Sequence, residues 1–337
     1  MFYYIIFPIL IIILNFISKK KRLFFPINQY EHQKLANIQL PLIGGLYLIV
    51  PITIIFHEKY FFFSLICFLI FILGILSDLK ILSSPKKRFF IQFLLIVYYI
   101  FFNKIEVLPS RIEFIDSNFL NSNLSFFFTV FCLMILINGS NFIDGMNGLL
   151  TGYLLIILIV IYQLRLNEFL NINEEDFLLI VYFFLIVLIF NIFNQFFLGD
   201  SGAYSMSFFI GYLLIEVYNQ NLIISPYFII LLLWYPCFEN LFSILRKIIK
   251  KRSALKPDSE HLHQFIFLYL KKKLRIKNLY ANLLTALIIN SINLFILYYG
   301  STEPFNTMLQ LELLFLSILI YVLSYLILKK FLKLNNS

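Results

Sequence analysis

Long apolar runs recur along almost the whole chain, and they limit its fold more than any other feature of the sequence. About 20 helical residues cross the hydrocarbon core of a bilayer, and eleven runs here approach or reach that length. With 61% hydrophobic side chains, the 337 residues carry more apolar surface than a soluble domain could bury. The runs lie near residues 2–17, 42–56, 60–77, 89–102, 124–143, 146–164, 177–194, 203–220, 222–245, 279–299 and 310–328.

The predicted fold class is all-α, a polytopic membrane helix bundle of about eleven transmembrane helices that forms one domain, residues 1–337. Backbone polar groups cannot bond to water inside lipid, and the runs lack the alternation of barrel strands. The first run has no basic segment before it and no small-residue cleavage site, so we expect an uncleaved first span rather than a signal peptide.

The basic residues predict the orientation of the bundle. The cluster from Lys19 to Arg22 follows the first run, which predicts an N-terminus outside and a C-terminus in the cytoplasm. In that orientation 23 of the 27 Lys and Arg residues lie on the cytoplasmic side, 11 of them in the loop 246–278. The net charge of +9 is therefore a topology signal. We expect contacts with membrane lipids and no nucleic-acid partner.

The cysteines and histidines do not predict a zinc site. The three cysteines, Cys67, Cys132 and Cys237, lie inside apolar runs without metal-ligand spacing, so we assign them to packing. His261 and His263 lie two residues apart with no further zinc ligands nearby. Binding of phosphate, together with nearby Lys or Arg, fits their surroundings better.

Two polar segments rich in Gly interrupt the apolar runs. One extends from Asn138 to Gly148 and contains Asp144; the other is Phe197-Leu-Gly-Asp-Ser-Gly202, which contains Asp200. Either Asp could cap the helix that follows it, and Ser201 could do so in place of Asp200. Alternatively, Gly-flanked backbone at a helix N-terminus could bind phosphate.

Two further polar segments have a structural and a functional interpretation. Asp78 could pair with Lys80 or with the basic residues 86–88, and Ser84-Pro85 is typical of a helix start. Lys34 could lie among lipid head groups or contact a phosphate beside Gly44 and Gly45, which could also allow close helix packing. Residues 265–273 predict a short helix in the membrane interface.

The predicted topology places Asp78, Asp144, Asp200 and His261 at the inner membrane boundary. Independent helix caps have no reason to share one face. Carboxylates without cysteine, together with basic residues, favour Mg²⁺ and phosphate chemistry. At a membrane boundary, a lipid phosphate could be one reactant in a phosphoryl transfer.

The ordered motifs resemble the polyprenyl-phosphate N-acetylhexosamine-1-phosphate transferases. This family includes phospho-N-acetylmuramoyl-pentapeptide transferase and the UDP-N-acetylglucosamine:undecaprenyl-phosphate transferases. The motifs are Pro41-Leu-Ile-Gly-Gly45, Ser77-Asp78 with Ser84-Pro85, Asn141-Phe-Ile-Asp-Gly-Met-Asn-Gly148, Phe197-Leu-Gly-Asp-Ser-Gly202 and His261-Leu-His263. They follow the family's order from about residue 32 to residue 264.

The resemblance implies a Mg²⁺-dependent enzyme, in which Mn²⁺ could replace Mg²⁺. It would transfer a HexNAc 1-phosphate from a UDP-N-acetylhexosamine to undecaprenyl phosphate and release UMP. It would lie in the bacterial cytoplasmic membrane with its active site facing the cytoplasm, and the family leaves room for a homodimer.

The resemblance also implies roles for single residues. Asp200 is expected to bind the metal, Phe197 to stack on uracil, and Asp78 to lie near the attacking lipid phosphate. The catalytic set implied is Asp78, Asp144, Asp200, His261 and His263, with the two histidines at the diphosphate. The substrate-binding set implied is Lys34, Asn141, Gly145, Asn147 and Phe197.

Three positions depart from the family pattern, and two rival interpretations stay open. Ser77, Asn147 and Gln264 stand where the family often has Asp, Asp and His, which leaves room for a catalytically inactive relative. A flippase or transporter of lipid-linked sugars is the other rival. Its polar residues should gather near the membrane midplane, with internal repeats, and the sequence has neither. Which HexNAc is used stays open.

Overall fold

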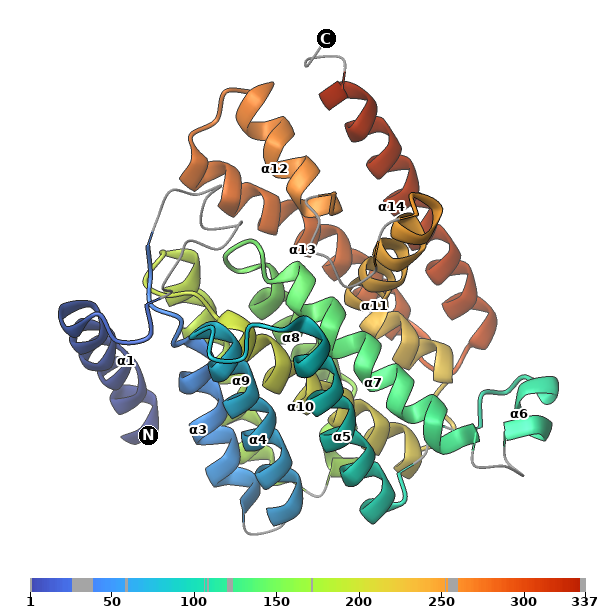
Figure 1. Ribbon diagram of the computed structural model, residues 1–337. Helices are drawn as coiled ribbons and strands as arrows, with labels where there is room; N and C mark the ends of the chain where they lie inside the picture. Colours follow the sequence, from blue (N-terminus) through green and yellow to red (C-terminus); the bar gives the residue numbers. More distant parts are fainter. Residues whose placement is uncertain are drawn as a thin grey trace.

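The chain forms a bundle of helices in the computed structural model (Figure 1). The structure describes residues 2–25, 39–57, 60–105, 107, 109–119, 124–170, 172–251, 253 and 260–333. Across these residues, the only extended pairing is an isolated parallel bridge between Leu42 and Phe197. The helices are α1 (Phe2–Lys21), α3 (Gly44–His57), α4 (Phe61–Asp78), α5 (Pro85–Asn103), α6 (Glu113–Phe119), α7 (Leu124–Ile143), α8 (Leu149–Gln163), a 3₁₀ turn η1 (Leu166–Leu170), α9 (Glu174–Ile192), α10 (Gly199–Gln220), α11 (Pro226–Ile249), α12 (Leu262–Lys272), α13 (Asn278–Thr302) and α14 (Thr307–Lys333).

The predicted all-helical membrane bundle is confirmed. Each of the eleven apolar runs coincides with a helix. Among the described residues, seven helices are long and apolar enough to cross a membrane, and α3 and α8 are shorter apolar helices. The number of spans that cross the bilayer and their orientation stay predictions. The short helix expected after the histidines is α12; its place in the membrane interface stays a prediction too.

The helix starts follow local sequence signals. The expected start at Ser84-Pro85 is confirmed, since α5 begins with Pro85 at its first position and Ser84 as the flanking residue. The same arrangement recurs at Ser225 and Pro226 in α11. The acidic residues 174–176 occupy the first turn of α9, where they complement the helix dipole.

Helix α10 is the central element, because α3, α4 and α7 all pack against it. Small residues make this packing possible. A Cβ atom on Gly74 of α4 would lie 2.2 Å from the Ser201 Cα atom, and one on Gly45 of α3 would lie 2.5 Å from the Gly202 nitrogen. The first turn of α10 is therefore held in backbone contact with two other helices.

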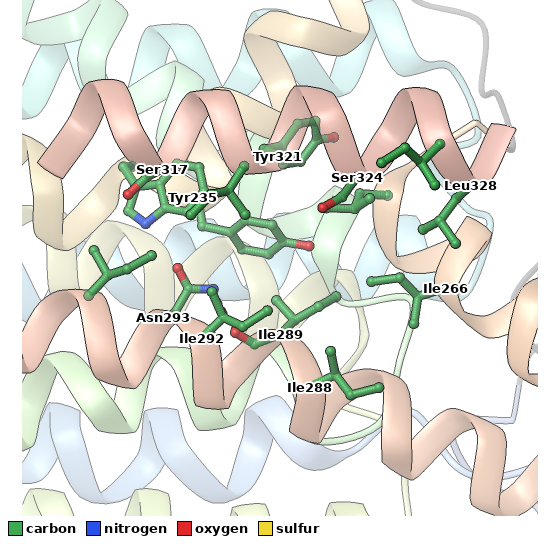
Figure 2. Close-up of a pocket in the computed structure, with 15 residues that line it drawn as sticks. Tyr235, Ile266, Ile288, Ile289, Ile292, Asn293, Ser317, Tyr321, Ser324 and Leu328 are labelled. Atoms are coloured by element: carbon green, nitrogen blue, oxygen red, sulfur yellow. Dashed lines mark hydrogen bonds between the residues drawn. The ribbon is translucent and has the colours of Figure 1, made fainter. Parts of the chain in front are cut away.

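Helices α11 to α14 form a second group beside this centre (Figure 1). They enclose a largely apolar cavity of about 320 Å³, shown in Figure 2, whose lining includes Tyr235 of α11, Ile266 of α12, Asn293 of α13 and Tyr321 of α14. Leu262, which lies between His261 and His263 in the sequence, is also part of the lining. The cavity therefore directly adjoins the histidine segment.

Candidate active site

Asp78 caps the N-terminus of α10 from a different helix. It is the last residue of α4, and its carboxylate accepts the backbone N–H groups of Asp200 at 2.9 Å and Ser201 at 3.1 Å. A carboxylate is stabilised there because the first N–H groups of a helix have no partners within the helix. The alternative in which Asp200 or Ser201 caps this helix is wrong, because both residues lie inside its first turn and the helix start has no side-chain capping bond of its own.

The turn before α10 depends on a glycine. Gly199 has φ of +79°, a conformation that other residues rarely adopt. A Cβ atom at this position would lie 2.7 Å from Oδ2 of Asp78. Gly199 thus allows both the turn and the approach of the capping carboxylate.

Asp200 projects from the first turn of α10 into a group of polar side chains. Its Oδ1 accepts a hydrogen bond from Asn141 at 2.7 Å, and its Oδ2 lies 2.9 Å from the Arg88 guanidinium. The Ser77 hydroxyl also donates to Oδ2 and receives a bond from Arg88. The Asp200 side chain is 15% exposed, so a ligand can still reach it.

Asp144 joins the same carboxylate cluster from the end of α7. The backbone N–H of Gly199 is hydrogen-bonded to it. Burial raises the pKa of Asp144 well above its ordinary value, and the nearby charges of Asp200 and Asp78 raise it further. The alternative in which Asp144 caps the next helix is wrong, because Gly148 occupies that position, with φ of +81°. The three carboxylates instead converge at the start of α10.

The two histidines face this cluster from the start of α12. Their rings are stacked, with centroids 5.5 Å apart, and the Phe142 ring lies 5.1 Å from His261. A Cβ atom on Gly145 would lie only 2.9 Å from Nε2 of His263. Lys247 of α11 lies on the other side, with its ammonium 5.7 Å from the Phe142 centroid. The histidine segment therefore meets the turn that carries Asp144.

Glu260 fixes the histidine segment to two other helices. It pairs with Lys250, the residue that follows α11, and lies 3.8 Å from Lys329 of α14. Burial alone raises the pKa of Glu260, but the hydrogen bond from Lys250 and the surrounding positive charges outweigh this effect and hold its pKa below the ordinary value. The ionised form is therefore favoured, and the segment is held by charge as well as by packing.

The remaining predicted binding residues lie close to this cluster, in different surroundings. Phe197 is buried against Leu40 and Leu42. Asn147 is also buried, and its side chain donates to Asn194 at 2.6 Å. The binding roles of Phe197, Asn147, Asn141 and Gly145 stay predictions. Lys34 lies outside the described residues.

Sequence reasoning missed several polar contacts. The sequence pattern grouped Arg88 with two neighbouring basic residues and predicted no role for Glu239. In the structure, Arg88 contacts Asp200, and Glu239 lies 2.8 Å from Nδ1 of His261. The signal for Glu239 was its place inside an apolar run, where carboxylates are rare without a function. Gln264 also has a structural role, since its side chain accepts the backbone N–H of His261 at 3.2 Å.

The donor set fits a hard cation better than zinc. Within the described part of the chain, no three His, Cys, Asp or Glu side chains form a ready-made metal cage. Mg²⁺ does not need one, because one or two carboxylates together with substrate phosphates can hold it. Asp200 and its neighbouring carboxylates meet that condition. All three cysteines are free, and Cys67 is buried in the core, in agreement with packing roles.

The geometry therefore combines carboxylates, basic side chains and histidines from six separate segments. Comparison with known proteins relates the chain that carries this site to a known family. Residues 60–218 match the model of glycosyl transferase family 4. This match confirms the resemblance, and it includes all three clustered aspartates.

Curated relatives extend the likeness beyond the matched segment. A probable undecaprenyl-phosphate N-acetylglucosaminyl 1-phosphate transferase of Bacillus subtilis is 26% identical over 246 residues, which cover 70% of this chain and 68% of that protein. An undecaprenyl-phosphate alpha-N-acetylglucosaminyl 1-phosphate transferase of Thermotoga maritima is 23% identical, with coverage of 69% and 70%. A phospho-N-acetylmuramoyl-pentapeptide-transferase of Dictyoglomus turgidum is 31% identical, with coverage of 50% and 57%.

Proposed function

We propose that this family 4 glycosyl transferase moves an N-acetylhexosamine 1-phosphate from a UDP-sugar to undecaprenyl phosphate. A phosphate oxygen of the lipid attacks the β-phosphorus of the UDP-sugar. The bond from that phosphorus to the bridging oxygen breaks, and UMP leaves with the oxygen. The product is a lipid-linked sugar diphosphate that starts a cell-envelope glycan.

The convergence of the motifs at the start of α10 carries the proposal. Asp78, Asp144 and Asp200 come from three helix ends far apart in sequence, yet their charges act on one another. The relatives that share this segment are named as transferases of the same reaction type. Phosphoryl transfer depends mainly on positioning and on neutralising charge, and this site offers basic and acidic groups for both tasks.

Asp200 is the proposed metal ligand, with Mg²⁺ as the cofactor and Mn²⁺ as a substitute. A divalent cation supplies positive charge that offsets the negative charge on the diphosphate. His261, His263 and Lys247 are proposed to bind the diphosphate from the opposite side. Asp78 orients the first turn of α10, and with it Asp200.

The serine at position 77 does not prevent this chemistry. A phosphate monoester with a second pKa near 6 is already largely ionised at neutral pH, so the attacking oxygen needs no base. Ser77 is instead part of the hydrogen-bonded group around Asp200. An inactive relative is the remaining alternative, and release of UMP distinguishes the two.

A panel of UDP-sugars tests the proposal. Membranes that contain the chain are incubated with undecaprenyl phosphate, Mg²⁺ and either UDP-GlcNAc, UDP-GalNAc or UDP-MurNAc-pentapeptide, and UMP is measured. We expect UMP from at least one donor and none after chelation with EDTA; addition of Mg²⁺ or Mn²⁺ should restore it. No UMP from any donor under these conditions would count decisively against the proposal.

The matched variant is Asp200→Asn, which keeps the size of the side chain and removes its charge. We expect loss of activity with a folded protein, as judged by its elution profile in detergent. Wild-type turnover by this variant would remove Asp200 from the proposed metal site.

The proposed location is the bacterial cytoplasmic membrane, with the site on the cytoplasmic side, where UDP-sugars are made. The excess of basic residues in loops on that side supports this orientation. A homodimer stays a prediction.

A further inference from the structure

Glu239 is a buried carboxylate that the proposed chemistry does not use. It lies within α11, three residues after Pro236, and its side chain is 0% exposed. Its Oε1 atom lies 2.8 Å from Nδ1 of His261. Tyr235 of α11 and Tyr321 of α14, both on the cavity wall in Figure 2, lie close enough to feel its charge.

This contact fixes which edge of the His261 ring can meet a substrate. The His263 ring stacks on it and the Phe142 ring lies beside it at a tilt, with centroids 5.5 Å and 5.1 Å away. Because Nδ1 is directed at Glu239, a contact with a ligand must be made through Nε2. An imidazole whose ring nitrogen binds a carboxylate is held in one tautomer and one orientation.

The pair also responds to charge. A carboxylate excluded from water is costly to ionise unless a cation pairs with it, so Glu239 and His261 can share one proton or carry opposite charges. A diphosphate at Nε2 favours the second state, because an imidazolium donates hydrogen bonds from both nitrogens. When a diphosphate is bound, the negative charge of Glu239 thus stabilises the positive charge of His261.

We propose that Glu239 is a positioning residue that orients His261 and supports its positive charge toward the diphosphate of the UDP-sugar. The inference rests on the proposed function for the identity of the ligand. Glu239 does not itself touch the substrate. It contacts Nδ1 of His261, on the edge of the ring that is turned away from the proposed substrate.

A purely structural contact between α11 and α12 is the competing explanation. It predicts loss of stability and an equal effect on both substrates. A positioning role predicts a selective effect on the nucleotide sugar and complete dependence on His261. A double-mutant cycle separates the two, because residues that act through one contact are not additive.

The experiment uses the full chain, purified in lipid nanodiscs, and measures kcat and KM for each substrate. We expect Glu239→Gln to lower kcat/KM for the UDP-sugar by about 10- to 100-fold, the usual range for a residue that orients another, while KM for undecaprenyl phosphate stays within about twofold. Glu239→Asp should recover part of the loss. In a His261→Asn background, Glu239→Gln should have no further effect.

Glu216→Gln is the matched control, since it removes a carboxylate from α10 where that group accepts a hydrogen bond from Gln220. It should leave both KM values unchanged. If Glu239→Gln does not fold, Glu239→Asp and Tyr321→Phe replace it in the cycle.

Three results would overturn the inference: wild-type kinetics in Glu239→Gln, equal changes for both substrates, or additive losses with His261→Asn. If the wild-type protein releases no UMP, the proposed function fails separately. Calorimetric titration with UDP and Mg²⁺ then decides the Glu239 inference: weaker binding by Glu239→Gln, absent from the His261→Asn background, supports it, and unchanged binding contradicts it.

Discussion

At the scale of single residues, the site depends on contacts with almost no spare room. Gly145 has no side chain, which leaves room for the His263 ring, and Asp200 contacts both Arg88 and Asn141. Gly145, Arg88 and Asn141 support the site rather than react. They hold the Asp200 carboxylate and the His263 imidazole in place.

Gly145→Ala should impair binding of the nucleotide sugar. The added Cβ atom would lie 2.9 Å from Nε2 of His263, so the ring must move. We expect kcat/KM for the UDP-sugar to fall by about tenfold or more, because small displacements in an active site are costly. The control is Gly300→Ala, whose Cβ atom would meet the side-chain end of Leu231 far along the chain from the site. Equal kcat/KM in both variants would show that the reaction does not depend on the present position of the His263 ring.

Arg88→Gln should weaken the site through Asp200. Removal of one partner leaves a partly buried charge without its cation, which is more damaging than loss of an exposed pair. We expect turnover to fall by about tenfold, with partial recovery in Arg88→Lys, since a lysine keeps the charge but not the forked geometry. Lys87→Gln changes an exposed neighbour and should behave as wild type. Undiminished turnover in Arg88→Gln would show that the ion pair between Arg88 and Asp200 is not needed for the reaction.

At the scale of helices, the start of α10 links the fold to the site. Asp78 from α4 and Asp144 after α7 both bind its first N–H groups. Gly74 brings the backbone of α4 against the same turn. The position of Asp200 is therefore set by helix packing as much as by its own sequence.

Gly74→Ala should lower both stability and activity. Its Cβ atom would lie 2.2 Å from the Cα atom of Ser201, so two backbones must separate. Overpacking of this kind costs about 1–3 kcal/mol, and the shift displaces Asp200 as well. A thermal unfolding scan and the UMP assay should show both losses together. A variant with the wild-type midpoint and wild-type turnover would disprove this account of the contact.

Sequence reasoning reached the helices and the clustered carboxylates but not how they are joined. The apolar runs predicted each long helix, and the Gly-flanked Asp144 and Asp200 were recognised as site candidates. Asp78 as a cap on a distant helix could not be predicted, because local capping rules consider only the residues beside a helix end. The hydrogen bond from the Asn147 amide group to Asn194 could not be predicted either. Such pairings depend on tertiary contacts that no local pattern encodes.

At the scale of the whole molecule, one end of the bundle carries the site, and the basic loops are predicted to lie at the same boundary. The cavity among α11 to α14 adjoins the histidine segment through Leu262. The residues of the site come from segments between residue 77 and residue 263. The site is therefore complete only after all of these segments have assembled.

The predicted orientation can be tested by labelling in intact cells. Arg165→Cys and Lys272→Cys are introduced singly at exposed positions, after Cys67, Cys132 and Cys237 are replaced by Ala. A membrane-impermeant maleimide should label position 165 in intact cells and position 272 only after permeabilisation, because the basic loop is expected inside. The reverse pattern would invert the bundle and place the site outside.

The contact between Asp78 and the first turn of α10 also bears on biogenesis. The two partners are 122 residues apart, so ribosomes must extend the chain well past α4 before the helix that carries Asp200 can enter the membrane. A nascent chain that stalls earlier holds Asp78 but lacks its backbone partners. In such a chain the carboxylate of Asp78 lacks the two N–H groups that hold it in the finished bundle, so this part of the site forms only after α10 has been made.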